Sequence, residues 1–372
     1  MLYTSCIWTG LYELEAQGRL TLEVSLRPRP DLAEVNGLYK HPLNLCVFCM
    51  RVEDTATRTV RIVYIDLVDG EGIASAGGLA AADVYFKRSY REEFIQSRML
   101  FPKFRRKIYP FGLFFPVISA HQHSELRRAV VAEVASGVPF RNPAESLWRI
   151  RQRIKGVLES RRHRNSEDDW SRNNKRDFEA AVEVPDKRQI LFLTRTFDPE
   201  AKWNSDNREY VIALNEQRAK IIRSIRKYFG TRFVGSLISD AYAKANYPDC
   251  VATVSTVRAD YLQPLRESRV AISTTGLMDS IPAKLAEYIA AARCVLSDPL
   301  RFELPFDIAH LHNALFFNST DECIESSERL LSDDGLATHM RHENERLYRT
   351  HIEPSAAIWN CIQIAFAHAE AP

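Results

Sequence analysis

The stretch TTGLMDSIPAKLAEYIAAARCVLSD, residues 274–298, decides the fold of the second half of the chain. It follows the apolar segment 269–274, which is typical of a buried strand, and it contains a loop, a helix over about 281–292 and the start of a further strand. Ser280 is a favourable N-cap residue, and Pro282 suits the first helical turn. A strand, loop and helix in this order place backbone N–H groups and the positive end of the helix dipole at the carboxyl edge of a parallel sheet. The stretch therefore predicts a site for a phosphate or diphosphate.

The rest of the second half alternates between strand-like apolar runs and helical periodicity. Expected strands are 189–195, 232–237, 250–254, 269–274, 295–297 and 314–317, and expected helices are 211–229, 259–267, 281–292, 321–331 and 335–348. In the first of these helices, apolar residues recur at helical spacing, namely Val211, Leu214, Ile221, Ile222, Ile225 and Phe229. Repeated alternation of this kind predicts a parallel sheet with helices on both faces.

The first half of the chain alternates less regularly. Helices are expected at 11–17 and 125–136, and strands at 20–26, 44–52, 61–67 and 83–86. The pattern predicts a second, smaller α/β domain, and a length of 372 residues suits two domains. The expected organisation is an N-terminal domain over 1–150, a linker over 151–185, a C-terminal domain over 186–350, and a last helix within 351–372.

Composition and charge exclude several classes of protein. Apolar residues are 45% and charged residues 26%, which excludes a disordered chain or a coiled coil as the main architecture. The net charge of +2 gives no general reason to expect a nucleic acid partner. The seven cysteines are scattered, which favours a reducing compartment and therefore the cytoplasm. No apolar run is long enough to span a membrane.

The linker holds a strongly basic segment. Residues 149–176 contain ten Lys and Arg against four Asp and Glu, so this segment carries more net charge than the whole chain. We expect a charged helix followed by a loose connection between the domains. An alternative function for the chain is a non-catalytic module that binds a polyanion through this segment.

Two acids in the 274–298 stretch suit the recognition of hydroxyl groups. Asp279 lies in the loop, and Glu287 follows with seven residues between them, about two turns into the expected helix. Their carboxylates cannot be neighbours, but they could lie on either side of an elongated ligand. A carboxylate accepts hydrogen bonds from both hydroxyls of a ribose, which suits Glu287, while Asp279 suits the hydroxyls of a group beyond the diphosphate.

This order of residues resembles the donor-binding signature of GT-B glycosyltransferases, in particular the retaining group with the acid–seven residues–Glu motif. The resemblance implies two Rossmann-like domains facing a cleft, with Asp279 contacting the donor sugar and Glu287 holding the nucleotide ribose. It also implies loop contacts to the donor from Gly276, Leu277, Met278 and Ser280. It further implies that the last helix, within 351–372, packs back on the N-terminal domain. The resemblance covers roughly residues 184–367.

A second match lies just after the first strand of the C-terminal domain. Members of this group often carry an Arg and a Lys there that contact the donor diphosphate, and Arg195 and Lys202 occupy those places. Two cations beside a helix N-terminus would stabilise the charge that develops on the leaving nucleoside diphosphate. Lys284, three residues before Glu287, would either assist the diphosphate or pair with Glu287. Such a site requires no metal ion or other cofactor, so none is expected.

The acceptor side is expected in the first half of the chain. Asp66 at a strand end and His121 after an apolar run are the candidate catalytic residues there, in addition to Asp279. Residues 101–115 interleave aromatic side chains with four Lys and Arg, which is typical either of a core strand with a basic edge or of a surface that lies on anionic lipid.

We therefore expect a glycosyltransferase that moves a sugar from a nucleoside diphosphate sugar to a hydroxyl acceptor in surface polysaccharide or glycoconjugate synthesis. The expected partners are the nucleotide-sugar donor and a glycan or lipid-linked acceptor, with no nucleic acid. The expected location is the cytoplasm, either free or at the inner face of the membrane. A further alternative is a nucleotide-sugar epimerase or hydrolase on the same fold, for which Asp66 is the candidate acid.

Overall fold

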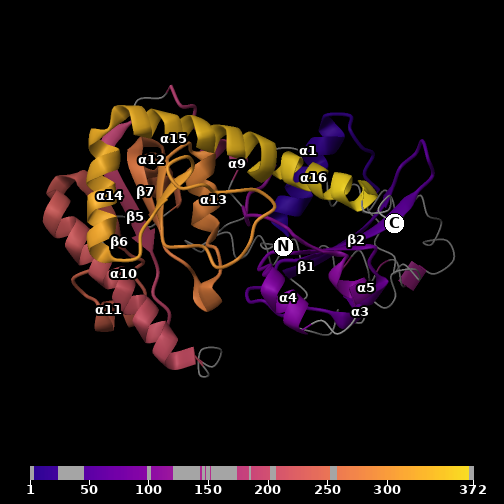
Figure 1. The fold of residues 1–372 in the computed structure, drawn as a ribbon, viewed down its shortest axis with the longest axis horizontal. Helices are drawn as coiled ribbons and strands as arrows, with labels where there is room; N and C mark the ends of the chain where they lie inside the picture. Colours follow the sequence, from indigo (N-terminus) through magenta and orange to yellow (C-terminus); the bar gives the residue numbers. More distant parts are fainter. Residues whose placement is uncertain are drawn as a thin grey trace. The chain divides into compact units, whose positions relative to one another are not determined.

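The computed structural model divides the chain into two compact units (Figure 1). Unit 1 comprises Met1–Lys175, Glu303–Pro305 and Thr350–Pro372, and unit 2 comprises Arg176–Phe302 and Phe306–Arg349. The residues that the structure describes are 4–23, 46–98, 102–119, 143–144, 147, 151, 174–183, 186–201, 207–251 and 258–367. Both units combine strands with helices, so the expected α/β class with two domains is confirmed.

Unit 2 is built on a five-stranded sheet in which neighbouring strands are parallel. The strands are β5 (Lys187–Thr194), β6 (Phe233–Leu237), β7 (Ser268–Ser273), β8 (Cys294–Ser297) and β9 (Ala314–Phe316). Their order is β6-β5-β7-β8-β9, and Val251 adds one parallel bridge to Leu237 of β6. Counted along the chain, the order is 3-2-1-4-5-6, which is that of the Rossmann fold. Of the strand expected at 250–254, residues 252–254 lie outside the described residues.

Helices cover both faces of the unit 2 sheet (Figure 1). They are α10 (Arg208–Phe229), α11 (Ala241–Asn246), α12 (Arg258–Glu267), α13 (Ala283–Ala290), α14 (Thr320–Ser332) and α15 (Asp334–Leu347). The face that holds Ile190, Ile272 and Leu296 packs against α10, α14 and α15 in one buried core. Because alternate residues of a strand point to opposite faces, Leu191 and Ala271 face the other side, where α12 and α13 contact the sheet.

Helix α10 is amphipathic, and its spacing agrees with the sequence pattern. The apolar residues from Val211 to Phe229 that recur at helical spacing are all buried. The helix ends at Gly230, whose φ of 55° favours glycine. Tyr210 and Arg218 also lie on this helix, and their side chains reach the loop that follows β7.

Unit 1 holds a four-stranded sheet in the order β1-β2-β3-β4 among its described residues. The strands are β1 (Val47–Glu53), β2 (Val60–Asp66), β3 (Val84–Lys87) and β4 (Ile108–Pro110), and short helices lie between them as α3 (Ala76–Ala81), α4 (Glu92–Arg98) and α5 (Pro102–Arg105). Strand β1 is antiparallel to β2, while β2, β3 and β4 are parallel. The strands expected at 44–52, 61–67 and 83–86 correspond to β1, β2 and β3.

The first helix begins earlier than the sequence pattern predicts. A helix is expected at 11–17, and α1 spans Ser5–Ala16. Its first turns are largely buried, so they show no clear amphipathic pattern. The last helix, α16 (Pro354–Ala367), packs along α1 (Figure 1). Gly10 permits this approach, because a Cβ there would lie 2.3 Å from the carbonyl oxygen of Pro354.

Several other expectations fall outside the described residues. They include the helix at 125–136, residues 24–26 of a predicted strand, and most of the linker 151–185. Within that linker, the short helix α9 spans Lys175–Phe178, and the division between the two units falls after Lys175. Among the described helices, none is both long enough and apolar enough to cross a bilayer.

Candidate functional site

The loops after β5 and β7 lie together at the carboxyl edge of the unit 2 sheet. These two strands are neighbours, yet the chain continues from β5 to β6 on one side and from β7 to β8 on the other. Ligands of open parallel sheets bind where the connections diverge in this way. Arg195 directly follows β5, and 274–280 directly follow β7. The topology therefore brings the candidate donor residues of both loops to one edge.

A buried arginine joins the two loops. Arg218 of α10 is 3% exposed. Its Nη1 donates to the carbonyl oxygen of Arg195 at 2.6 Å, and its Nη2 donates to the carbonyl oxygen of Thr275 at 2.6 Å. Its Nε donates to Thr274 Oγ1 at 3.3 Å. One rigid guanidinium thus sets the spacing between the loops after β5 and β7.

Burial lowers the pKa of Arg218 to about 10, and the nearby Asp298 opposes this shift. At neutral pH the guanidinium therefore remains charged. Because the groups that accept its hydrogen bonds are neutral carbonyl and hydroxyl oxygens, its charge is not cancelled by a direct ion pair in these contacts. The charge adds to the attraction of this edge for an anion.

Asp298 connects a third loop, the one after β8, to the same place. Its two carboxylate oxygens each accept from the backbone N–H of Thr275 at 3.0 Å, and Oδ2 also accepts from Thr275 Oγ1 at 3.2 Å. Burial raises the pKa of Asp298, while the Thr275 hydrogen bonds and the charge of Arg218 act in the opposite direction. The loop after β7 is thus held from both neighbouring strands.

The loop after β7 closes into a tight turn. The backbone N–H of Gly276 donates to the carbonyl oxygen of Ser280 at 2.7 Å, and that of Ser280 donates to the carbonyl oxygen of Leu277 at 3.1 Å. A Cβ at Gly276 would lie 2.6 Å from Ser280 Oγ, so a larger residue there would displace the Ser280 side chain. Met278 and Asp279 have φ values of 55° and 56°, in the left-handed region that is unfavourable for side-chain-bearing residues.

The predicted N-cap of the following helix is wrong. Ser280 does not cap α13, because it lies two residues before the N-cap position and its backbone closes the turn. Pro282, with the extended conformation usual for this position, is the N-cap residue, and the helix begins at Ala283. The sequence pattern placed this helix two residues too early because Ser and Pro are both common at helix starts.

Asp279 is held by two side chains from other elements. Its Oδ1 accepts from the Tyr210 hydroxyl at 2.9 Å, and its Oδ2 forms an ion pair with Arg301 Nη1 at 2.5 Å. The Asp279 side chain remains 29% exposed. Met278, the preceding residue, is half exposed at 50%. The predicted sugar-facing acid is therefore both oriented and accessible.

Glu287 lies in a different environment. It is fully buried on α13, and its Oε2 accepts from the Tyr261 hydroxyl at 2.6 Å. Lys284 Nζ lies 4.2 Å from the centre of the Tyr261 ring, so Lys284 packs on an aromatic face. A ribose could reach Glu287 only if Tyr261 moved away from the carboxylate. The predicted ion pair between Lys284 and Glu287 is not among the salt bridges of the described residues.

Of the two predicted diphosphate ligands, only Arg195 is described. Its side chain is exposed at the carboxyl end of β5, while its backbone carbonyl is held by Arg218. Lys202 lies outside the described residues, as does the candidate catalytic His121.

Asp66 is fully buried at the end of β2. Its carboxylate accepts from the backbone N–H groups of Val68 at 2.9 Å and Ala74 at 3.0 Å and from the Tyr85 hydroxyl at 2.7 Å, and Lys87 Nζ lies 3.5 Å away. These contacts hold the turn after β2, and the catalytic role of Asp66 stays a prediction.

Sequence reasoning missed Tyr210, Arg218, Tyr261, Asp298 and Arg301. The position of one of them, Arg218, in the sequence pattern indicates a buried role. Arg218 lies four residues after Leu214 and four before Ile222, so it falls on the apolar face of the predicted helix, where an unpaired charge would be costly. The others contact the site from elements distant in the sequence. No group of three His, Cys, Asp or Glu that could hold a metal ion is found among the described residues.

No protein family and no curated protein matches the chain. Similar solved structures include the C-terminal domain of a glycosyl transferase group 1 family protein (LpcC) from Francisella tularensis, with 13% identity, coverage of 48% of this chain and 97% of that one, and a TM-score of 0.33. An alpha-glucosyltransferase in complex with UDP-glucose and DNA containing an abasic site has 11% identity, coverage of 78% and 67%, and a TM-score of 0.40.

Anabaena Alr3699/HepE, in complex with UDP and glucose, has 10% identity to this chain. The match covers 78% of this chain and 79% of that one, with a TM-score of 0.36. Sugar-transferring enzymes thus appear among the structures that this chain resembles, at low identity.

Proposed function

We propose that the chain is a glycosyltransferase that moves a sugar from a nucleoside diphosphate sugar to a hydroxyl acceptor. The observation that carries this proposal is the arrangement around Arg218. This buried guanidinium joins two loops at the point where the strand connections diverge, and those loops present an exposed cation, Arg195, and an oriented acid, Asp279. A cation and a hydroxyl-binding acid on neighbouring loops suit a sugar diphosphate.

The diphosphate would bind between Arg195 and the start of α13. The N-terminal N–H groups of a helix attract anions, and α13 begins without a side-chain cap. Lys284 in its first turn adds a second cation. These groups would stabilise the negative charge that develops as the bond between the sugar and the diphosphate breaks.

The two acids would bind hydroxyl groups at the ends of the donor. Asp279 uses one lone pair on each carboxylate oxygen for Tyr210 and Arg301 and retains others for sugar hydroxyls. At Glu287, a ribose hydroxyl would replace the Tyr261 hydroxyl as the donor to the carboxylate. This exchange substitutes one O–H···O hydrogen bond for another, so its cost is modest.

In the reaction, the acceptor hydroxyl would form a bond to the anomeric carbon while the bond from that carbon to the diphosphate oxygen breaks. Positioning and electrostatic stabilisation would supply most of the rate enhancement. A retaining outcome, with a diphosphate oxygen taking the proton of the acceptor, is part of the proposal. Because Arg195, Lys284 and the helix N-terminus supply the positive charge, the proposed reaction uses no metal ion.

Binding of the donor can be tested by thermal shift with UDP, GDP, ADP and their glucose esters. A ligand that binds only the folded protein raises the midpoint of unfolding. We expect one nucleotide to raise the midpoint of the wild type and of Glu328→Ala, a surface glutamate control, but not that of Glu287→Ala. Asp279→Ala should lose turnover and keep the affinity for the free nucleoside diphosphate. The proposal fails if no nucleotide shifts the wild type, or if Glu287→Ala responds equally.

Among the residues that the structure describes, no observation favours the alternative functions. An epimerase or hydrolase would need an acid in the first half of the chain, and Asp66 is buried and saturated with donors. The polyanion-binding reading depends on the basic segment 149–176, of which 152–173 lie outside the described residues.

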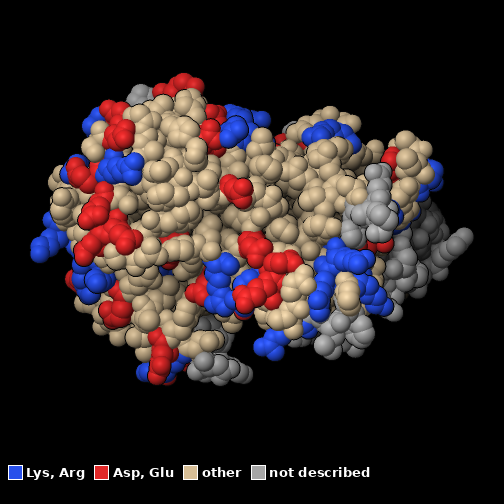
Figure 2. Space-filling view, viewed as in Figure 1, with Lys and Arg blue, Asp and Glu red and all other residues tan. Residues whose placement is uncertain are grey.

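For the acceptor, we propose a lipid-linked or glycan hydroxyl presented at an anionic membrane surface. Lys and Arg side chains gather over the part of unit 1 that holds α5 (Figure 2). Lys103 and Arg106 there are exposed. Lys107 has a structural role instead, since its Nζ donates to the carbonyl oxygens of Ala80 and Ala82 at the end of α3.

Vesicle sedimentation tests this surface. The double substitution Lys103→Glu and Arg106→Glu should abolish binding to vesicles that contain phosphatidylserine, because it replaces attraction with repulsion. Lys227→Glu, an exposed position of unit 2, is the matched control. Equal binding by the wild type, the double variant and the control would contradict a membrane contact at α5.

A further inference from the structure

The turn after β7 has a positive φ at two successive residues, Met278 and Asp279. Aspartate adopts this region more readily than most residues do, so the strain lies mainly at Met278. For such a residue the conformation costs about 1–2 kcal/mol. It persists only where surrounding contacts over-determine it, and such contacts are characteristic of functional sites. The contacts that fix this turn are therefore informative.

The hydroxyl oxygen of Tyr210 contacts three polar groups of the turn. The backbone N–H of Asp279 donates to the Tyr210 hydroxyl at 3.0 Å. That hydroxyl lies 2.9 Å from both the carbonyl oxygen of Gly276 and Asp279 Oδ1, and it can donate its single hydrogen to either. The oxygen thus touches both ends of the strained turn and the Asp279 carboxylate.

The chemistry of the phenol suits this role at neutral pH. Partial burial raises the pKa of Tyr210 to about 12, so the hydroxyl keeps the hydrogen that it donates. Arg301 holds the other carboxylate oxygen of Asp279. Among these contacts, only that of Tyr210 fixes the backbone of the turn and the carboxylate together.

We propose that Tyr210 is a positioning residue for the donor sugar, which holds the turn of residues 276–280 in its strained conformation and aims the Asp279 carboxylate. This inference rests on the proposed glycosyltransferase function, in which Asp279 binds the sugar. Tyr210 itself touches no reacting atom in this account. Its hydroxyl should therefore matter for the sugar half of the donor and not for the nucleotide half.

The test compares Tyr210→Phe with Tyr247→Phe. Each substitution removes one hydroxyl oxygen and keeps the ring. The Tyr247 hydroxyl also donates to a carboxylate, that of Glu216 of α10, at 2.9 Å, but it makes no contact with the turn. Tyr247 is therefore a matched control for the loss of one tyrosine hydrogen bond in the same unit.

The first measurement needs no nucleotide. The chain contains five methionines, so the methyl resonance of Met278 can be assigned in a selectively labelled sample. We expect Tyr210→Phe to shift or broaden this resonance, because the turn relaxes, and Tyr247→Phe to leave it unchanged. An unchanged Met278 resonance in Tyr210→Phe would overturn the proposal.

The second measurement is the affinity for UDP, GDP and ADP and for their glucose esters, by calorimetry. For the nucleotide that binds the wild type, Tyr210→Phe should weaken the glucose ester about tenfold and leave the free diphosphate within about twofold. Equal loss for both ligands, or no loss for either, would overturn the positioning role. If no nucleotide binds the wild type while the Met278 resonance moves, the proposed function falls, and the role of Tyr210 in donor positioning falls with it. The contact between Tyr210 and the turn would then stand as structural only.

Discussion

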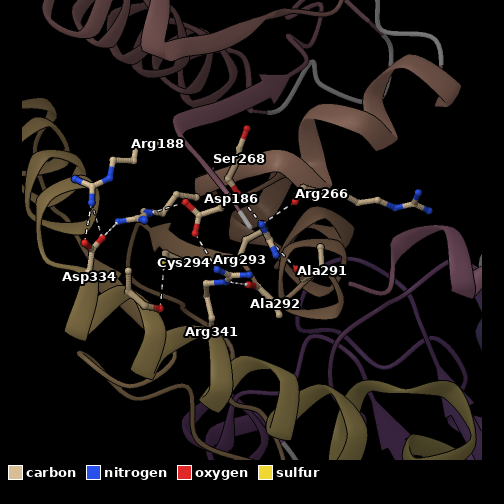
Figure 3. A network of polar contacts seen from close by, with 12 residues as sticks. Asp186, Arg188, Arg266, Ser268, Ala291, Ala292, Arg293, Cys294, Asp334 and Arg341 are labelled. Carbon is tan, nitrogen blue, oxygen red and sulfur yellow. Dashed lines mark hydrogen bonds and ion pairs between the residues drawn. The ribbon is translucent and has the colours of Figure 1, made fainter. Parts of the chain in front are cut away.

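The two edges of the unit 2 sheet each bury an arginine, yet they differ in what surrounds it. At the carboxyl edge, Arg218 is 3% exposed and donates to loop carbonyls beside a strained turn. At the amino edge, Arg293 is fully buried (Figure 3). Burial lowers the pKa of each to about 10. A buried cation with a perturbed pKa does not by itself identify a binding site.

The partners of Arg293 belong to the framework of the fold. Its Nε donates to the carbonyl oxygen of Ala291 at 2.6 Å, and its Nη1 donates to those of Arg266 at 2.7 Å and Ser268 at 3.1 Å. These oxygens lie at the ends of α13 and α12 and at the start of β7. A cation there satisfies carbonyl groups that a helix end leaves without partners.

Around Arg293, ion pairs continue the framework. Asp186 accepts from Arg269 at 2.7 Å and from Arg341 at 2.8 Å, and Asp334 pairs with Arg188 and Arg269 (Figure 3). Ala292, whose carbonyl oxygen accepts from Arg341 Nε at 3.2 Å, has a positive φ of 51°, so backbone strain occurs at both edges. The carboxyl edge differs because it also presents an exposed cation, Arg195, and an accessible acid, Asp279, and this combination distinguishes the candidate site.

The largest expected effect is on stability at the amino edge. Arg293→Met keeps a long unbranched side chain and leaves three buried carbonyl oxygens without their donor. We expect the free energy of unfolding to fall by about 3 kcal/mol, since each unsatisfied group costs about 1–3 kcal/mol and the surroundings relax in part. Urea unfolding measures this loss. The affinity of the folded variant for the nucleotide should stay unchanged. A weaker affinity would contradict the proposal that only the carboxyl edge takes part in binding.

Arg218→Met should change both quantities. We expect a loss of about 2 kcal/mol in stability, because two loop carbonyls lose their donor, and a loss of at least tenfold in nucleotide affinity, because the loops separate. Arg218→Lys tests geometry, since one ammonium cannot reproduce the fork that spans both loops. Calorimetry should find both variants weakened. A Lys variant with wild-type affinity would reduce the role of Arg218 to its charge.

The edges should also respond to pH with opposite signs. Burial raises the pKa of Asp298, so the folded state binds a proton at Asp298 at a higher pH than the unfolded state does. The contribution of Asp298 to stability therefore rises as pH falls from 7 through its folded-state pKa. The hydrogen bond from Arg269 lowers the pKa of Asp334, and its contribution is present above its unfolded-state pKa and lost as pH falls through the folded-state value.

Urea unfolding between pH 3 and pH 7 checks these signs in Asp298→Asn and Asp334→Asn. The stability difference between wild type and Asp298→Asn should grow as pH falls, whereas the difference for Asp334→Asn should shrink. The second effect should be small, because the Asp334 side chain is 62% exposed. Slopes of the same sign would contradict the assignment.

Tyr261→Phe should tighten nucleotide binding. In the free protein the Tyr261 hydroxyl donates to Glu287, and binding of a ribose requires that this contact be released. Removing the hydroxyl removes that competition, which corresponds to about 1 kcal/mol or roughly a fivefold gain in affinity. Calorimetry with the nucleotide identified by thermal shift measures it. A weaker affinity in Tyr261→Phe would show that the phenol assists the nucleotide instead of competing with it.

The sequence predicts the framework of unit 2 well because the framework depends on local pattern. Short apolar runs predict β5, β7 and β8, and helical spacing predicts α10 and its buried face. The positions of Asp279 and Glu287 relative to these elements follow directly. The alternation of strands and helices is enough to place both acids in unit 2, one in a loop and one on a helix.

The contacts of the candidate site could not be predicted in the same way. Tyr261 lies 26 residues from Glu287, and Tyr210 lies 69 residues from Asp279, so only tertiary structure brings each pair together. The burial of Asp66 follows from its neighbours on β3, which pattern alone does not align with it. The sequence pattern predicts a helix at 11–17, whereas α1 begins at Ser5, because its first turns are largely buried and show no clear amphipathic pattern.

The smallest expected effect concerns the strain itself. In Met278→Gly the left-handed conformation no longer carries its steric cost, which is about 1–2 kcal/mol for a residue with a side chain. The substitution adds the backbone entropy cost of glycine, about 0.5–1 kcal/mol. The net result should be a gain of about 0.5 kcal/mol in stability, measured by urea unfolding.

Glycine adopts more backbone conformations than methionine does, so the turn in Met278→Gly would be held less firmly in one of them. The affinity for the glucose ester should therefore fall slightly, while the affinity for the diphosphate stays constant. Arg58→Gly is the matched control, because Arg58 also has a positive φ, of 59°, but lies in unit 1 and outside the candidate site. Met340→Gly would not serve as a control, because Met340 is buried in the core. Arg58→Gly should gain stability and leave both affinities unchanged. A loss of affinity for the glucose ester in both variants would show that the effect of Met278→Gly does not depend on the turn at the carboxyl edge.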